Sequence, residues 1–305
     1  MLKKLLIVIT LCLLLINPLS LFSKEKKIII GAKNFTENII FSEITRILLE
    51  KKGYNIVLKK GVGSTVIRKA LETGQVDMYY EYTGTAYTVY YKGSDFDIMR
   101  DGSKLYKWVR KNDKKKGLIW LKPLDINNTY TLMMQQKNVK EYNIYNISDL
   151  VKYMEGRKKP IKIGIDAEFY GRSDGFKALA EYYNFPQNKY IAKIMDQGLT
   201  YLSLKEGLLD VAMGFATDGR IKYYNLVNLE DDKRFFPVYN PACVVRKVVL
   251  DKFPDIKIYI NKLADKIDLN DIRRLNYLTD IKHKSVESVA KKFFNTLKFN
   301  KIKNK

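Results

Sequence analysis

The segment YEYTGTAY, residues 80–87, places three tyrosines around a Thr-Gly-Thr turn. The face of an aromatic ring carries negative charge density and attracts cations, so tyrosines on a loop can form part of a ligand site. Tyrosine is also abundant, at 22 of 305 residues, and core packing is the alternative explanation for these rings. The pattern around this segment must distinguish a binding loop from ordinary packing.

Few residues could support catalysis or metal binding. His283 is the only histidine, and Cys243 is the only cysteine outside the N-terminal apolar run. No Cys-His metal cluster, Ser-His pair or Cys-His pair can be assembled from these residues, and the mature chain cannot form an internal disulfide. No pair of carboxylates stands out as an acid–base couple. We therefore expect no enzyme, no metal site and no cofactor.

The N-terminal residues 1–23 have the charged start, apolar run and proline break of a signal peptide. Cys12 lies inside the apolar run rather than after it, so we expect an exported, periplasmic or otherwise extracytoplasmic protein without a lipid anchor. This segment holds two lysines and no acids, and its removal lowers the net charge from +22 to +20. The remaining lysines are scattered among acids, which favours a solvated surface over a nucleic-acid site.

Short apolar runs alternate with amphipathic stretches in the first part of the mature chain. Apolar residues at helical spacing predict two helices, and the runs between them predict strands. The expected strands cover residues 26–33, 54–61 and 76–82, and the expected helices cover residues 34–53 and 64–74. This βαβαβ order predicts a parallel α/β sheet with ligand-binding loops at the carboxyl ends of its strands.

The same order of elements recurs between residues 161 and 215. When the two halves are aligned on the glycine that ends the second helix, ALETGQVDMYYEYTG lies over SLKEGLLDVAMGFATD. Asp77 then matches Asp210, and Tyr82 falls on Phe215. An aromatic residue thus follows the equivalent strand in both halves, and two similar α/β lobes are the simplest explanation.

The chain starts no third unit of this kind after residue 215, so we expect it to return to the first lobe. Lobe I then comprises residues 24–127 and 233–305, and lobe II comprises residues 128–232. The two crossings are expected near Asp125–Asn128 and Glu230–Arg234. Two lobes joined in this way can close on a ligand like a clamp.

Six segments resemble, in order, sequence blocks of the substrate-binding proteins of osmoprotectant ABC transporters, which capture glycine betaine, choline, carnitine and related quaternary amines. They are GAKNFTENIIFSEI, DMYYEYTGTA, NNTYTL, MDQGLTY, GFATDGRI and FFPVYNPACVVRK, and they span nearly the whole mature chain. The resemblance implies a type II periplasmic-binding-protein fold, a two-lobe Venus flytrap with two hinge crossings. No permease segment is fused to the chain, so we expect a monomer that serves a separate ABC permease.

The resemblance also implies an aromatic cage around a trimethylammonium group, with Tyr82, Tyr130, Phe215 and Tyr239 as its walls. Phe215 stands where many members of the family have tyrosine. A quaternary ammonium has no N–H, so ring faces rather than hydrogen bonds must select it, at roughly 0.5–2 kcal/mol for each contact. Three or four such contacts could supply most of the approximately 8 kcal/mol of a micromolar affinity.

For a ligand carboxylate, the resemblance implies roles for Lys33, Arg172 and Thr85. Asn128 matches an acidic or polar position near the ammonium group. The alternatives are plain surface charge for Lys33 and Arg172, and a helix cap or turn for Thr85 and Asn128.

Other functions remain open at this point. The nearest alternative is a binding protein for another small cationic solute such as an amino acid, which an acidic partner for an α-amino group would favour. An exported enzyme is disfavoured by the lone histidine, and a sensory module would need a receptor. The sequence does not determine which quaternary amine is bound, its affinity or the permease.

Overall fold

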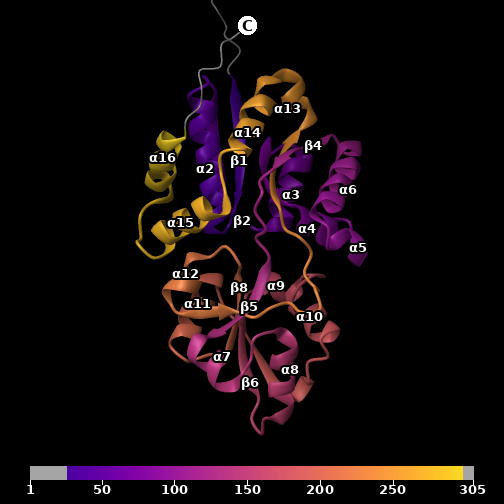
Figure 1. Cartoon of the computed structure of the whole chain (residues 1–305). Coiled ribbons are helices and arrows are strands. Elements are labelled where there is room, and N and C mark those ends of the chain that lie inside the picture. The colour runs from indigo at the N-terminus through magenta and orange to yellow at the C-terminus, as the bar shows by residue number, and fades with distance from the viewer. Residues whose placement is uncertain (1–25, 298–305) are drawn as a thin grey trace, which may run out of the picture.

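The structure, a computed structural model, describes residues 26–297, which fold into two lobes that are each built around one five-stranded sheet (Figure 1). The predicted signal peptide, residues 1–23, lies outside the described residues. The strand order is β2-β1-β3-β10-β4 in the first sheet and β7-β6-β8-β5-β9 in the second. The first sheet contains β1 (Lys27–Lys33), β2 (Asn55–Val62), β3 (Met78–Tyr82), β4 (Leu118–Pro123) and β10 (Pro241–Arg246), and the second contains β5 (Tyr130–Gln135), β6 (Ile161–Ile165), β7 (Tyr190–Ile194), β8 (Val211–Phe215) and β9 (Leu226–Asn228).

Helices surround both sheets (Figure 1). In the first lobe they are α2 (Thr36–Glu50), α3 (Ser64–Thr73), α4 (Thr83–Thr85) with a following π-helical turn (Ala86–Tyr90), α5 (Phe96–Met99), α6 (Gly102–Lys115), α13 (Lys247–Lys252), α14 (Asp255–Ala264), α15 (Leu269–Asp280) and α16 (Val286–Thr296). In the second they are α7 (Gln136–Tyr142), α8 (Ile147–Gly156), α9 (Ala167–Gly171), α10 (Phe176–Tyr182), a 3₁₀ turn (Gln187–Lys189), α11 (Gln197–Lys205) and α12 (Gly219–Tyr223). Within the described residues, no helix combines the length and apolar character that a membrane span requires.

The sheets are mixed rather than wholly parallel. Strand β1 runs parallel to β2 and β3, and β6 runs parallel to β7 and β8, as the βαβαβ order predicts. The prediction of a parallel sheet is wrong for β10, which is antiparallel to β3 and β4, and for β5, which is antiparallel to β8. Both strands enter their sheet from the other lobe, so β10 begins at the edge where β3 ends and β5 begins at the edge where β8 ends.

The internal repeat predicted from the sequence has a matching geometry in the two lobes. Asp77 accepts the N–H of Ile29 at 2.9 Å, and Asp210 accepts the N–H of Lys162 at 2.7 Å. Each aspartate thus binds the backbone of the neighbouring parallel strand, 48 residues earlier in the chain. The second helix of each half also ends at a glycine with positive φ, Gly74 at +80° and Gly207 at +73°. Glycine adopts this left-handed conformation without a steric cost.

Helix α2 is buried on nearly all sides, because β1 and β2 cover one face and α14, α15 and α16 pack on the others. Its buried polar residues are therefore hydrogen-bonded to the sheet. Asn38 Nδ2 donates to the carbonyl of Tyr80 at 2.9 Å, and Ser42 Oγ donates to the carbonyl of Gly31 at 3.1 Å. These contacts fix the first turn of α2, which contains Glu37, at the edge of the sheet that faces the second lobe.

The two segments that cross between the lobes are hydrogen-bonded to each other. The N–H of Asn128 donates to the carbonyl of Tyr239 at 3.1 Å, and Asn240 Nδ2 donates to the carbonyl of Ile126 at 2.8 Å. Phe235 and Phe236 still pack with the core of the second lobe, whereas β10 starts the return at residue 241. The lobe boundaries predicted at 127/128 and 232/233 stay predictions.

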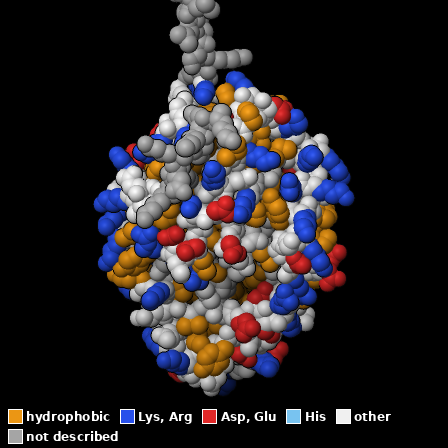
Figure 2. All heavy atoms as spheres, turned by 45° about the horizontal axis from the view of Figure 1, so that its top comes forward, with side chains coloured by type: hydrophobic (Ala, Val, Ile, Leu, Met, Phe, Trp, Pro, Cys, Tyr) orange, Lys and Arg blue, Asp and Glu red, His pale blue; other side chains and the backbone are white. Residues whose placement is uncertain are grey.

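The visible surface carries lysines and arginines spread among acids rather than gathered into one patch (Figure 2). Several charged side chains of the protein are paired locally, such as Arg46 with Glu50 at 2.8 Å and Lys247 with Asp251 at 2.6 Å. Exposed pairs of this kind contribute little to stability.

Candidate functional site

A cavity of about 720 Å³ lies between the two lobes. All eight residues that the sequence analysis selects line it: Lys33, Tyr82 and Thr85 from the first lobe, Tyr130, Arg172 and Phe215 from the second, and Asn128 and Tyr239 from the crossing segments. The structure therefore brings together residues that are up to 206 positions apart in the chain. Ligand binding by these residues stays a prediction.

The strand ends explain why the four predicted cage rings meet. Tyr82 and Phe215 are the last residues of β3 and β8, whose carboxyl ends face the gap between the lobes. Tyr130 is the first residue of β5 and pairs with Phe215, while Pro241 at the start of β10 pairs with Tyr82. Tyr239 precedes that start by two residues. Both sheets thus present the same edge to the cavity.

The rings form a continuous arc. Tyr130 lies 4.9 Å from Phe215 and 5.7 Å from Tyr239 between ring centroids, the latter edge to face. Phe35, which sequence reasoning missed, joins this arc, with its centroid 5.6 Å from Phe215 and 5.7 Å from Tyr82. Phe35 lies directly before α2, inside the GAKNFTEN segment, and it lines the cavity. The signal available in the sequence was an aromatic residue at the start of the predicted helix.

Gly84 in the tyrosine segment allows one ring of the arc to approach the backbone. A Cβ atom at this position would lie 2.7 Å from Cδ1 and Cε1 of Tyr239 and 2.9 Å from Cγ of Pro237. Any side chain at residue 84 would therefore displace Tyr239. The glycine of the Thr-Gly-Thr turn serves ring packing rather than a special backbone angle.

Behind Tyr82 lies a buried carboxylate that sequence reasoning also missed. Glu37 Oε1 accepts the Tyr82 hydroxyl at 2.7 Å and Asn128 Nδ2 at 2.9 Å, and Oε2 accepts the Thr217 hydroxyl at 2.7 Å. Burial raises the pKa of Glu37, while the hydrogen bonds from Thr217, Tyr82 and Asn128 act in the opposite direction. We call these four residues the Glu37 cluster.

Behind Tyr239 lies a second buried carboxylate, Asp174. It binds Arg172 through two hydrogen bonds of 2.7 Å, and it accepts the hydroxyls of Tyr239 at 2.7 Å and Thr88 at 2.6 Å. Burial opposes the ionisation of Asp174, but the adjacent Arg172 charge outweighs it and the pKa of Asp174 lies below its ordinary value. Arg172, Asp174, Tyr239 and Thr88 form the Asp174 cluster.

The Arg172 guanidinium is hydrogen-bonded within the protein through all three nitrogens. Besides Asp174, its guanidinium contacts Glu168 at 3.2 Å and the Thr85 hydroxyl at 3.2 Å, and its Cζ lies 5.3 Å from the Tyr130 ring centroid. Each of its three nitrogens therefore has a protein acceptor.

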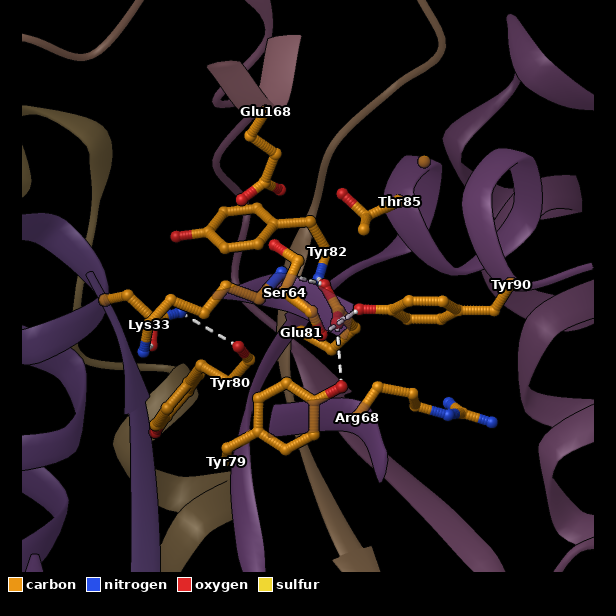
Figure 3. A network of polar contacts seen from close by, with 12 residues as sticks. Lys33, Ser64, Arg68, Tyr79, Tyr80, Glu81, Tyr82, Thr85, Tyr90 and Glu168 are labelled. Atoms are coloured by element: carbon orange, nitrogen blue, oxygen red, sulfur yellow. Dashed lines mark hydrogen bonds and ion pairs between the residues drawn. The ribbon is translucent and has the colours of Figure 1, made fainter. Parts of the chain in front are cut away.

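Lys33 is paired with Glu81 at 2.6 Å, and both side chains are buried. Glu81 also accepts the hydroxyls of Tyr79 at 2.7 Å and Tyr90 at 2.8 Å, which point at it in Figure 3. Lys33 Nζ lies 5.3 Å from the centroid of the Tyr82 ring. Tyr79 and Tyr90 thus hold the ion pair, whereas Tyr82 lines the cavity.

The second lobe also contributes acids to the cavity. Asp166, Glu168 and Asp196 of the second lobe line it. Burial raises the pKa of Asp166. Glu168 is only partly buried, and the nearby Lys33 charge and the Ser64 hydrogen bond hold the pKa of Glu168 below its ordinary value. Among residues 26–297, no group of three or more His, Cys, Asp or Glu side chains could hold a metal ion.

Comparison with known proteins identifies this arrangement. The family profile described as "Substrate binding domain of ABC-type glycine betaine transport system" matches residues 26–296. The chain is 35% identical over 269 residues to a glycine-betaine-binding protein of Pseudomonas aeruginosa, covering 87% of this chain and 86% of that one. It is 34% identical over 281 residues to the carnitine transport binding protein OpuCC of Listeria monocytogenes, covering 89% and 87%.

A solved structure described as a glycine betaine/carnitine/choline ABC transporter superposes with a TM-score of 0.72 at 32% identity, covering 88% of this chain and 98% of that one. The fold expected from the sequence, two α/β lobes of a periplasmic binding protein, is thereby confirmed.

Proposed function

The chain belongs to the family of substrate-binding domains of ABC-type glycine betaine transport systems, and we propose that it captures a quaternary amine between its two lobes for an ABC importer. The family consists of transporter binding proteins rather than enzymes. One observation carries the proposal: five aromatic rings contributed by both lobes form an arc around the cavity.

The chemistry of a trimethylammonium group matches such an arc. Its charge is spread over methyl groups, which pack on ring faces and offer no hydrogen-bond donor. Each desolvated ring contact contributes roughly 0.5–2 kcal/mol. We propose Tyr82, Tyr130, Phe215 and Tyr239 as the ring contacts, with Phe35 supporting two of them.

For ligands that carry a carboxylate, we propose Lys33 as the principal contact. Its ammonium has one hydrogen bond, to Glu81, and can donate two more. Arg172 would help by its charge and by orienting the Thr85 hydroxyl, because its own nitrogens already have acceptors. Asn128 would line the ligand site beside Tyr82.

The cellular setting follows from the family and the sequence together. We propose that the protein is exported through residues 1–23, carries no lipid anchor, and acts as an extracytoplasmic monomer. It would deliver its solute to the permease of that importer.

The acids at the cavity keep one alternative open, a binding protein for a cationic amino acid. Asp166 and Glu168 could pair with an α-amino group, which an aromatic arc does not require. Calorimetric titration with glycine betaine, carnitine, choline, glycine and arginine distinguishes the two functions. We expect binding of at least one quaternary amine and no detectable binding of glycine. Binding of arginine alone would overturn the proposed function.

A further inference from the structure

Glu37 differs from the other buried acids of the described chain in its partners. Glu81 pairs with Lys33, Asp113 with Arg68, and Asp174 with Arg172, at 2.6–2.7 Å. Glu37 is 3% exposed, and among residues 26–297 it forms no ion pair. Its hydrogen-bond partners are the hydroxyls of Tyr82 and Thr217 and the side-chain amides of Asn128 and Asn276.

A buried carboxylate without a counter-ion is costly, and proteins normally pair such a charge or protonate it. These hydrogen bonds to the two oxygens of Glu37 favour the charged form, since a carboxylate can only accept them. The site thus holds a carboxylate whose hydrogen bonds suit ionisation while burial opposes it. A cation bound nearby would resolve this conflict.

The place of Glu37 connects it to the cage. Its partner Tyr82 presents a ring to the cavity and donates its hydroxyl to Glu37, so the carboxylate lies on the far end of a proposed cage wall. A phenol that donates to an anion has a more electron-rich ring, which strengthens its attraction for a cation. The other partners come from the crossing segment and from the second lobe, so the cluster is complete only when the lobes meet.

Resting on the proposed function, we infer that Glu37 is the counter-ion of the bound quaternary ammonium and acts through the ring of Tyr82. It is a positioning and charge-selecting residue rather than a direct ligand contact. The side-chain amide of Asn128 is neutral, and its Nδ2 donates a hydrogen bond to the Glu37 carboxylate. The negative charge of the site is therefore supplied from α2 instead of from residue 128.

The variant Glu37→Gln removes the charge and can keep the hydrogen bonds. The Thr217 hydroxyl lies 2.7 Å from Glu37 Oε2 and 2.8 Å from Asn128 Oδ1. An amide nitrogen in place of Oε2 can donate to this hydroxyl, which then donates to Asn128. The control is Glu43→Gln, which removes a carboxylate from the same helix, where it pairs with Arg46 and Lys60 outside the site.

The probes are choline and 3,3-dimethyl-1-butanol, which has a carbon atom in place of the choline nitrogen and carries no charge. We expect Glu37→Gln to weaken choline binding by about tenfold to hundredfold, the scale of one charge pair across a partly desolvated site. Binding of the neutral probe, followed by NMR titration, should change by less than about twofold. Glu43→Gln should leave both affinities unchanged.

Thermal melting supplies a second measurement that does not depend on binding of the uncharged probe. If Glu37 is an unpaired charge, Glu37→Gln keeps or raises the melting temperature of the ligand-free protein and reduces the shift that choline produces. A loss of melting temperature without ligand, equal weakening of both probes, or unchanged choline binding would each overturn the inference. Wild-type protein that binds no quaternary amine would instead overturn the proposed function and, with it, this inference.

Discussion

The Glu37 cluster and the Asp174 cluster join the two lobes at opposite flanks of the cavity, near α12 and α15 on one side and near α4 and α10 on the other (Figure 1). In each, a buried carboxylate accepts the hydroxyl of a proposed cage tyrosine and a threonine hydroxyl from the other lobe. They differ in charge, because Arg172 neutralises Asp174 and no cation neutralises Glu37 among the described residues. Similar hydrogen bonding can thus hold the two lobes together at the Asp174 cluster and supply charge to the ligand site at the Glu37 cluster.

We expect the largest effect from a variant that disrupts the Asp174 cluster. Asp174→Ala leaves Arg172 buried beside Tyr130 with only Glu168 as an acidic partner, and removal of one member of a buried ion pair costs about 3–5 kcal/mol of unfolding free energy. Urea denaturation measures this loss. The matched control is Asp251→Ala, which removes an exposed pair with Lys247 and should cost less than about 1 kcal/mol. Equal losses of unfolding free energy for the two variants would contradict a structural role of the Asp174 cluster.

A variant of Lys33 tests whether this residue binds the carboxylate of a ligand. Lys33→Gln should weaken glycine betaine binding by about 1.5–3 kcal/mol, the scale of a charge-assisted hydrogen bond, and change choline binding much less. Calorimetry of both ligands on one variant provides the comparison, and a shared folding defect would appear as equal loss for both. Such equality would remove the carboxylate role of Lys33.

Thr217→Val should loosen the Glu37 flank without changing any charge. The variant loses one buried hydrogen bond between the lobes, worth about 0.5–1.5 kcal/mol, and should reduce the closed population at a fixed choline concentration. Small-angle scattering measures this as a larger radius of gyration than that of the wild type. Thr73→Val, at an exposed residue of α3, is the control. A radius identical to that of the wild type with partial ligand occupancy would show that the bond does not favour closure.

The smallest expected effect is the pH dependence of the ligand-free protein. Burial raises the pKa of Glu37 above its ordinary value of 4.5, so the folded chain retains a proton that the unfolded chain has lost. Unfolding free energy from this group therefore falls as the pH rises from about 4.5 through the raised pKa. The Asp280, Asp218, Arg220 and Lys33 side chains around the cluster persist in Glu37→Gln, so the difference between wild type and variant isolates residue 37. A difference that is constant with pH, or that grows in favour of the wild type, would contradict the assignment.

Sequence patterns were sufficient for the elements and for the residues at strand ends. The repeat placed Asp77 and Asp210 in equivalent positions, and it placed Tyr82 and Phe215 at equivalent strand ends, because local periodicity reports on strands and helices directly. The resemblance to a known family supplied the other six candidate residues of the site, whereas Phe35 and the acids of the cavity were not predicted.

The electrostatics of the site could not be predicted in the same way. Glu37 meets Thr217 across 180 residues, and Lys33 meets Glu81 across 48. Which carboxylate neutralises which cation depends on tertiary packing, and neither pattern nor spacing encodes it. The antiparallel entry of β10 and β5 was missed for a related reason, since strand direction depends on the path between the lobes.

A crystal structure of the protein with bound choline tests the central claim most directly. We predict that the trimethylammonium group lies against the faces of Tyr82, Tyr130, Phe215 and Tyr239, with both lobes in contact with the ligand and the Tyr82 hydroxyl still bound to Glu37. A choline whose ammonium group instead pairs with Asp166 or Glu168, away from these rings, would contradict the aromatic cage.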